Sequence, residues 1–172
     1  MAAAIAARTE RCSIGVMALL VTLYDPIRLA EDIAVVDLLS QGRLNFIAGM
    51  GYREVEFHIA NKPFAERGAW MDHVLETLLK AWSDEPFEYR GKMVNVTPKP
   101  FSRPHPMFLV GGMSKPAARR AARLGLPFAQ QAVDLVRQCV EVGQVHQANG
   151  AAADLVFIGR SDAAAGGADR RC

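Results

Sequence analysis

Three short segments carry residues that could bind a ligand, and each follows a run expected to form a buried strand. They are residues 22–25, 49–57 and 111–114. In proteins built on a parallel sheet, ligand sites lie at the carboxyl ends of the strands, on the loops that lead into the helices. These three loops are therefore the candidate binding segments, and the last of them has the strongest binding chemistry.

The turn Gly111, Gly112, Met113 and Ser114 has the composition of an anion cradle. Its two glycines let the backbone approach a ligand, and the helix expected behind them begins with free N–H groups and a positive dipole end. Ser114 adds a hydroxyl group. The turn lacks the lysine spacing of a P-loop and the full GxGxxG pattern. A phosphate cradle and an ordinary turn capped by serine explain these residues equally well.

The loop Gly49, Met50, Gly51 and Tyr52 follows a second expected strand. No helix is expected directly after this GxG, which argues against a Rossmann dinucleotide fingerprint. A flat aromatic ligand could approach the glycines and stack on Tyr52. The alternative is a glycine-rich turn on which Tyr52 packs as a lid.

Other catalytic and metal-binding arrangements are not supported by the sequence. No metal-ligand spacing joins the four histidines, which are His58, His73, His105 and His146. His58 lies near the mouth of the expected site and could donate to a substrate, whereas His73 is expected to be a partly buried or surface side chain. Neither a Ser/His/Asp constellation nor a pair of carboxylates can be placed.

The remaining polar candidates have structural explanations. Arg119, Arg120 and Arg123 are expected to form a solvated basic face of one helix. The three cysteines contain no CxxC pair, which excludes a zinc or thioredoxin-like motif. Cys12 and Cys139 are expected to be small buried apolar residues, as suits a reducing cytoplasm.

Length and composition exclude several classes of protein. With 51% hydrophobic and 22% charged residues, the chain is not wholly disordered, and its net charge of +2 argues against nucleic acid as a partner. No apolar run approaches the roughly 18 residues of a membrane span, and the first arginines follow the alanine-rich start rather than precede it. A cytoplasmic protein with no membrane partner is expected. At 172 residues it is shorter than the roughly 250 of a complete α/β barrel.

The expected elements alternate between helix and strand. Strands are expected at 12–23, 43–49, 107–110 and 154–158, and helices at 2–10, 26–40, 71–82, 115–124 and, more weakly, 133–142. A hairpin is expected at 87–96 and a loop at 50–63. The pattern indicates half of an α/β barrel or a small open α/β sheet. Residues 1–160 are expected to form one domain, and residues 161–172 a disordered tail.

Several strings resemble the bacterial luciferase-like monooxygenase family. The strings are DPIRLAED at 25–32, DLLSQGRL at 37–44 and GMGY at 49–52, followed in order by FAERG at 64–68, RPHP at 103–106, VGG at 110–112 and AARRAA at 117–122. The resemblance covers roughly residues 5–130. The 172-residue chain is therefore identified as similar to that family over most of its length.

The resemblance implies a flavin-dependent oxidoreductase with a partial (β/α)8 TIM barrel, comprising about strands three to six. Members use FMN, usually delivered reduced, to activate oxygen, or the related deazaflavin coenzyme for hydride transfer, and act on small organic molecules. The loop at 49–52 would lie along the flavin phosphate and ring, the turn at 111–114 would hold the phosphate, and residues 20–22 would line the ring.

This sequence also departs from the family pattern. Many relatives carry an arginine where this chain has Gly49 or Met50, with Arg53 the nearest substitute, and a histidine where it has Asp25. The resemblance begins in the family's second helix, so the first strand and the last two strands are expected to be absent. Such a half barrel has two open edges, through which another copy could pair. The alternatives are a non-catalytic remnant or assembly module of this fold, or an open α/β domain that binds a phosphate ligand.

Overall fold

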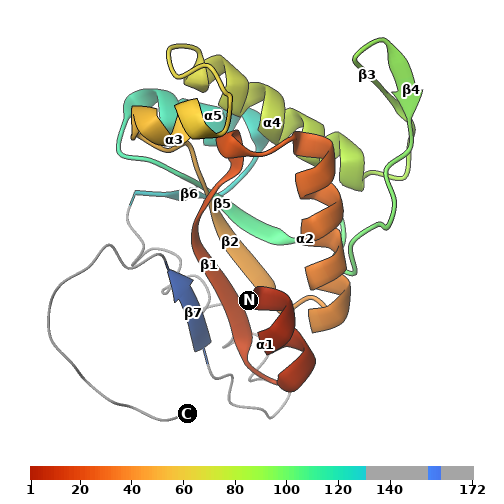
Figure 1. Cartoon of the computed structure of the whole chain (residues 1–172). Coiled ribbons are helices and arrows are strands. Elements are labelled where there is room, and N and C mark those ends of the chain that lie inside the picture. Colours follow the sequence, from red (N-terminus) through yellow and green to blue (C-terminus); the bar gives the residue numbers. More distant parts are fainter. Residues whose placement is uncertain (131–154, 160–172) are drawn as a thin grey trace, which may run out of the picture.

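A computed structural model describes residues 1–130 and 155–159 as an α/β structure centred on a parallel sheet (Figure 1). The sheet has the strand order β6-β5-β2-β1-β7. Its strands are β1 (Ser13–Leu20), β2 (Leu44–Gly49), β5 (Met107–Gly111), β6 (Phe128–Ala129) and β7 (Leu155–Gly159). The expected α/β class with parallel strands is therefore confirmed.

The helices follow the strands in alternation, as a βαβ chain requires. They are α1 (Ala2–Arg8), α2 (Pro26–Ser40), α3 (Glu54–Ile59), α4 (Arg67–Trp82) and α5 (Lys115–Leu124), with a short 3-10 turn η1 (Val21–Leu23) after β1. Figure 1 shows α2 and α4 side by side next to the sheet, in agreement with their contacts. None of these helices is long and apolar enough to cross a membrane.

The register brings the carboxyl ends of the central strands together. Leu20 at the end of β1 pairs with Gly49 at the end of β2, and Ala48 pairs with Val110 near the end of β5. Strands β2 and β5 are buried over most of their length, whereas in β1 only Ile14 and Gly15 are buried and Ala18 is exposed. The three loops that follow β1, β2 and β5 consequently leave the sheet at one edge, at the top of Figure 1.

Both ends of α2 are set by residues next to it in the sequence. The Asp25 side chain accepts hydrogen bonds from the backbone N–H groups of Ile27 and Arg28, and Pro26 occupies the first position of α2. The same helix ends at Ser40, as expected, and Gln41 (φ 54°) and Gly42 (φ 82°) after it have left-handed backbone. These caps fix where the loops at each end of α2 begin.

The core lies between the sheet and the helices. The Phe46 and Phe108 rings stack at 4.9 Å between their centroids, and the Trp82 ring meets Phe108 edge-on at 5.9 Å. Trp82 is fully buried and satisfies its indole N–H by donating to the Ala30 carbonyl at 3.1 Å. Helices α2 and α4 are thereby joined to each other and to the sheet.

The N-terminal helix is anchored by one arginine. The Arg43 guanidinium donates to the backbone carbonyls of Ala6, Thr9 and Cys12 at 2.8–3.1 Å. Cys12 itself is buried, as expected. Charge-assisted hydrogen bonds to three carbonyls hold α1 against the start of the sheet.

Three expectations need correction. The expected loop at 50–63 contains a helix, α3, which is held by the fully buried Phe57. Strand β6 is not among the expected elements. The run at 12–23, expected to be a buried strand, forms β1 only over Ser13–Leu20 and is buried only in part, with Ala18 exposed. The last strand pairs with β1, Ser13 opposite Leu155, and the described sheet has two edge strands, β6 and β7.

Two other expectations fare differently. The hairpin is confirmed, as β3 (Phe87–Tyr89) paired with β4 (Lys92–Val94), and in Figure 1 it extends away from the sheet. The helix expected at 133–142, the tail at 161–172, Cys139 and His146 lie outside the described residues.

Candidate ligand-binding site

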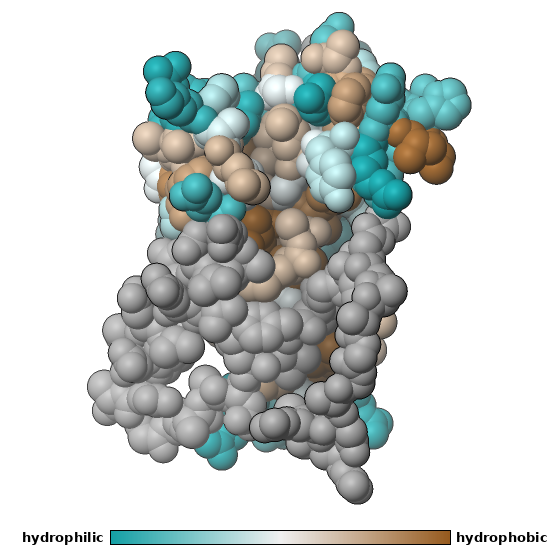
Figure 2. All heavy atoms as spheres, turned by 90° about the vertical axis from the view of Figure 1, so that its left-hand side faces the viewer, coloured by the Kyte–Doolittle hydropathy of each residue, from teal (hydrophilic) through white to brown (hydrophobic). Residues whose placement is uncertain are grey.

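A cavity of about 590 Å³ lies at the carboxyl ends of the strands. It is lined by the end of β1, the loop after β2, the turn after β5, the start of α5 and the end of β6. All eight residues proposed from the sequence line this cavity: Gly49, Met50, Gly51, Tyr52, Gly111, Gly112, Met113 and Ser114. Figure 2 views the molecule from the left of Figure 1 and shows polar side chains at the upper rim, with apolar residues between and below them.

The glycines after β5 are explained by close packing inside the chain. A Cβ on Gly111 would lie 2.5 Å from Ile47 Cγ2, and one on Gly112 would lie 2.6 Å from the Ala117 Cβ. Neither distance is tolerated without a shift of the backbone. The two glycines therefore allow β5 to lie close to β2 and bring the start of α5 against the turn at the cavity wall.

The start of α5 presents polar groups at the cavity. Ser114 is the N-cap, with its Oγ accepting from the Ala117 N–H at 3.4 Å. The first N–H groups of a helix have no partner within it, and Pro116 removes one of them. Ala117 and Ala118 donate their N–H groups to Ser114, so the N–H groups of Ser114 and Lys115, together with the dipole of this ten-residue helix, are the ones that favour an anion at this end.

The loop after β2 is shaped by a left-handed glycine. Gly51 has φ +82°, and a Cβ there would lie 3.2 Å from the Phe57 ring of α3. Tyr52 beside it is 80% exposed, so it does not pack as a lid on the sheet. Its ring is available to a ligand, as the other interpretation of this loop requires.

Two partly buried hydrogen bonds hold this loop in place. The Thr22 hydroxyl donates to the Met50 carbonyl at 2.5 Å, and the Trp70 indole N–H donates to the Thr22 carbonyl at 2.8 Å. Thr22 is fully buried. It joins the end of β1 to the loop after β2 and to α4. Sequence reasoning placed residues 20–22 at the site, but the tie to Trp70 is too distant in sequence to be anticipated.

Arg120 also lines the cavity, which corrects the expected solvated arginine face. Its side chain is only 9% exposed because it projects from the face of α5 that carries the buried Ala117 and Ala121. Arg119 is exposed and Arg123 is half exposed, so the expectation holds for those two.

A carboxylate on α4 holds Arg120 in place. Arg120 Nε and Nη2 donate to the two oxygens of Asp72 at 2.7 and 3.2 Å, and Nη2 also donates to the Gly68 carbonyl at 3.0 Å. Arg123 donates to the same Asp72 at 2.6 Å and to Glu76 at 2.6 Å. The hydrogen bond from Arg120, above all, lowers the pKa of Asp72 below its ordinary value, so this carboxyl is ionised at neutral pH.

The other sequence candidates lie away from the cavity wall. Arg53 forms an ion pair with Glu56 on α3, and Asp25 pairs with Arg90 while it caps α2. His58 is exposed on α3, and His73 is exposed and stacks between Trp70 and Tyr89. None of these side chains lines the cavity.

The described lining is suited to binding rather than to proton transfer. Within the described residues it contains no His, Asp, Glu, Lys or Cys side chain. No three His, Cys, Asp or Glu residues come together as metal ligands anywhere in the described ranges. Its polar groups are backbone amides, the Ser114 and Tyr52 hydroxyls, Gln130 and the Arg120 guanidinium. These groups can hold a flat, anionic ligand, and the reactive atoms would belong to that ligand.

Comparison with known families gives a consistent result. The family model described as luciferase-like monooxygenase matches residues 1–155. The chain is 27% identical over 129 residues to an FMNH2-dependent dimethylsulfone monooxygenase of Pseudomonas putida, covering 70% of this chain and 35% of that one. It is 29% identical over 130 residues to an uncharacterised Sinorhizobium fredii protein, y4vJ. That match covers 73% of this chain and 37% of y4vJ.

Solved structures share the fold. The monooxygenase RslO1 from Streptomyces bottropensis superposes with a TM-score of 0.66 at 26% identity, over 91% of this chain and 52% of that one. The oxygenating constituent of 3,6-diketocamphane monooxygenase from Pseudomonas putida, solved with FMN, superposes with a TM-score of 0.61 at 22% identity. The superposition covers 73% of this chain and 40% of that one. The sheet is thus part of a TIM barrel, and the chain spans 35–37% of the two curated relatives named above.

Proposed function

The chain belongs to the luciferase-like monooxygenase family, and on that premise we propose that its cavity binds FMN for the oxidation of a small organic substrate. The observation that carries the proposal is the meeting of two glycine-containing loops and a helix start at one cavity. The relatives that name a flavin name FMN, and none of those reported above supports the deazaflavin alternative.

The residues at the cavity fit this cofactor. Its volume of about 590 Å³ lies within the range of about 300–1,000 Å³ typical of ligand pockets. Met17, Leu20 and Ile47 offer an apolar wall for a flat ring, with the Tyr52 ring exposed at the rim. The Ser114 hydroxyl and the N–H groups of Ser114 and Lys115 at the start of α5 offer hydrogen-bond donors for a phosphate.

Bound reduced FMN would supply the electrons for oxygen activation. The chain's own residues would bind and orient. The loop at 49–52 would follow the ring and the turn at 111–114 would hold the phosphate. Thr22 would fix the first loop through its bond to the Met50 carbonyl. The apolar strand ends would exclude water from the ring face.

The direct test is flavin retention by the full chain in equilibrium dialysis. We expect FMN to be retained with a dissociation constant on the order of micromolar, whether offered oxidised or, without air, reduced. The deazaflavin coenzyme is offered in parallel. No retention of any flavin would overturn the proposal, and selective retention of the deazaflavin would replace the cofactor.

A second experiment separates an enzyme from a binding module of the same fold. The alternative is favoured by one observation, that the described lining of the cavity contains no His, Asp, Glu, Lys or Cys side chain. Flavin-dependent oxygen consumption with a reductase and candidate small substrates would support the enzyme. Retention of FMN without any turnover would support a non-catalytic module. Sedimentation at several concentrations would show whether copies pair through the sheet edges.

A further inference from the structure

One arginine at the cavity, Arg120, is buried and held in place by several hydrogen bonds. Arg120 is 9% exposed, and two of its three guanidinium nitrogens are bonded to α4. Arg123, on the same helix, reaches the same Asp72 but is 51% exposed and does not line the cavity. Burying a guanidinium costs desolvation free energy, so its position at the cavity wall suggests a functional role.

We propose that Arg120 is the cationic group that recognises the phosphate of the cofactor, and that Asp72 positions its guanidinium for this contact. This inference rests on the proposed FMN function. It adds a charged side chain to a subsite that the loop sequence alone supplies only with a hydroxyl and backbone N–H groups.

The geometry of α5 supports this assignment. Side chains in a helix lean toward its N-terminus, so Arg120 reaches back along the face that carries Ala117. Ala117 packs against Gly112 in the turn, and both line the cavity with Arg120. The guanidinium and the start of α5 therefore border the same cavity.

The hydrogen bonds leave part of the guanidinium for a ligand. Nε and Nη2 donate to Asp72 and Gly68, whereas Nη1 donates to no group in the described part of the chain. An arginine fork fixed on one side by a carboxylate is oriented in advance for an oxyanion on the other side. Little side-chain entropy would then be lost on binding.

The charge balance at the cavity also favours an anion. Arg120 is the one permanently charged side chain among the described lining residues. Its partner Asp72 is shared with Arg123, so a single carboxylate faces two guanidinium groups. Glu76 pairs with Arg123 on the exposed side, away from the cavity lining. The four side chains together carry no net charge, but of them only the Arg120 guanidinium lines the cavity, so a ligand there meets a positive charge.

The test compares FMN with riboflavin, which has the same ring and no phosphate. Dissociation constants for both are measured by flavin fluorescence with the wild-type chain, Arg120→Gln and the matched control Arg123→Gln. We expect Arg120→Gln to weaken FMN by on the order of tenfold to a hundredfold, with riboflavin changed by less than about twofold. Arg123→Gln should keep the wild-type ratio of the two constants.

Each outcome has one meaning. Equal losses for both flavins in Arg120→Gln would overturn the proposal and leave Arg120 a structural residue. Wild-type protein that retains neither flavin would instead overturn the proposed function. Should Arg120→Gln not fold, Asp72→Asn combined with Arg120→Gln removes both charges of the pair together. In that double variant a wild-type preference for FMN would overturn the role of Arg120, and loss of the preference would support it.

Discussion

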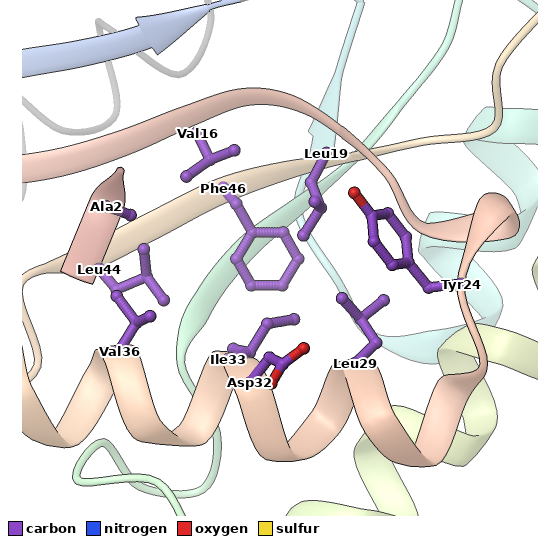
Figure 3. A pocket seen from close by; sticks show the side chains of 10 residues that line it. All are labelled: Ala2, Val16, Leu19, Tyr24, Leu29, Asp32, Ile33, Val36, Leu44 and Phe46. Carbon is purple, nitrogen blue, oxygen red and sulfur yellow. The ribbon is translucent and has the colours of Figure 1, made fainter. Parts of the chain in front are cut away.

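Two cavities of this molecule are lined by residues of different chemical character. The cavity at the strand ends is bounded by glycines, a helix start and one buried arginine. The second hollow, of about 280 Å³, lies between α2 and the face of β1 and β2 that packs against it. Figure 3 shows Phe46 of β2 in its middle, between Val16 and Leu19 of β1 and Leu29, Ile33 and Val36 of α2.

The difference separates binding chemistry from packing. The pocket behind α2 is a gap between aliphatic and aromatic side chains, whose polar neighbours are Tyr24 and Asp32. Apolar side chains of this kind contribute to stability through burial. The cavity at the strand ends brings backbone groups and a guanidinium to its wall. Substitutions at the cavity at the strand ends should therefore alter flavin binding. Substitutions at the pocket behind α2 should alter only the free energy of unfolding.

The largest effect is expected from Gly112→Val. The new Cβ would lie 2.6 Å from the Ala117 Cβ, so α5 or the turn must move away. We expect a loss of about 1–3 kcal/mol in the free energy of unfolding and loss of measurable FMN retention. Urea unfolding and equilibrium dialysis measure the two.

Gly68→Ala is the matched control for that variant. A Cβ at Gly68 would meet only Arg120 Nη2, at an ordinary 3.9 Å, and the position is helical. Stability should stay equal or rise, by about 0.5–1 kcal/mol at most. Equal damage from both glycine substitutions would contradict the special role given to the turn after β5.

Thr22→Val should have the next largest effect. It removes the hydroxyl that donates to the Met50 carbonyl and leaves that carbonyl without this donor. We expect a loss of about 1–2 kcal/mol in stability and several-fold weaker FMN binding.

Thr77→Val makes the same chemical change within α4, where the Thr77 hydroxyl donates to the His73 carbonyl. FMN affinity should be unchanged there because Thr77 does not line the cavity. Loss of FMN affinity in Thr77→Val but not in Thr22→Val would reverse the assignment of the two threonines.

The Asp72 pair predicts a specific dependence of stability on pH. Since Arg120 lowers the pKa of Asp72 in the folded chain, this carboxyl stabilises the fold fully above its unfolded pKa of about 3.9. That contribution is lost as the pH falls below this value toward the lower folded pKa. Urea unfolding at pH 6 and pH 3.5 should show a greater loss for wild type than for Asp72→Asn. Parallel losses would contradict the pair.

The smallest effect is expected behind α2. Val36→Ile adds one methylene toward the apolar pocket, which should raise the free energy of unfolding by at most about 0.8 kcal/mol. FMN binding should not change. A change in FMN affinity without a change in stability would mean that the two hollows are not independent.

Local sequence signals predicted most of the strands and helices that position the site. The β1, β2 and β5 runs, the helix at 26–40, the Ser114 cap and the hairpin all depend on neighbouring residues, and the structure has them. The eight loop residues were found because parallel strands must end at one edge. Rules that act over a few residues were sufficient for these features.

Features that depend on distant partners were missed. Arg120 is buried because it reaches Asp72, 48 residues earlier in the chain, and its own helix shows only an alternation of alanine and arginine. Helix α3 is too short to be stable alone and depends on the burial of Phe57. The sequence predicts a strand at the end of the chain, but the choice of β1 as its neighbour is a tertiary property.

Amide hydrogen exchange of the full chain with and without FMN tests the central claim most directly. We predict slower exchange at residues 49–52 and 111–114 when FMN is present, with no change along α2 beyond its first turn. Protection centred on α2 and the pocket behind it, or no protection at either loop, would contradict an FMN site at the carboxyl ends of the strands.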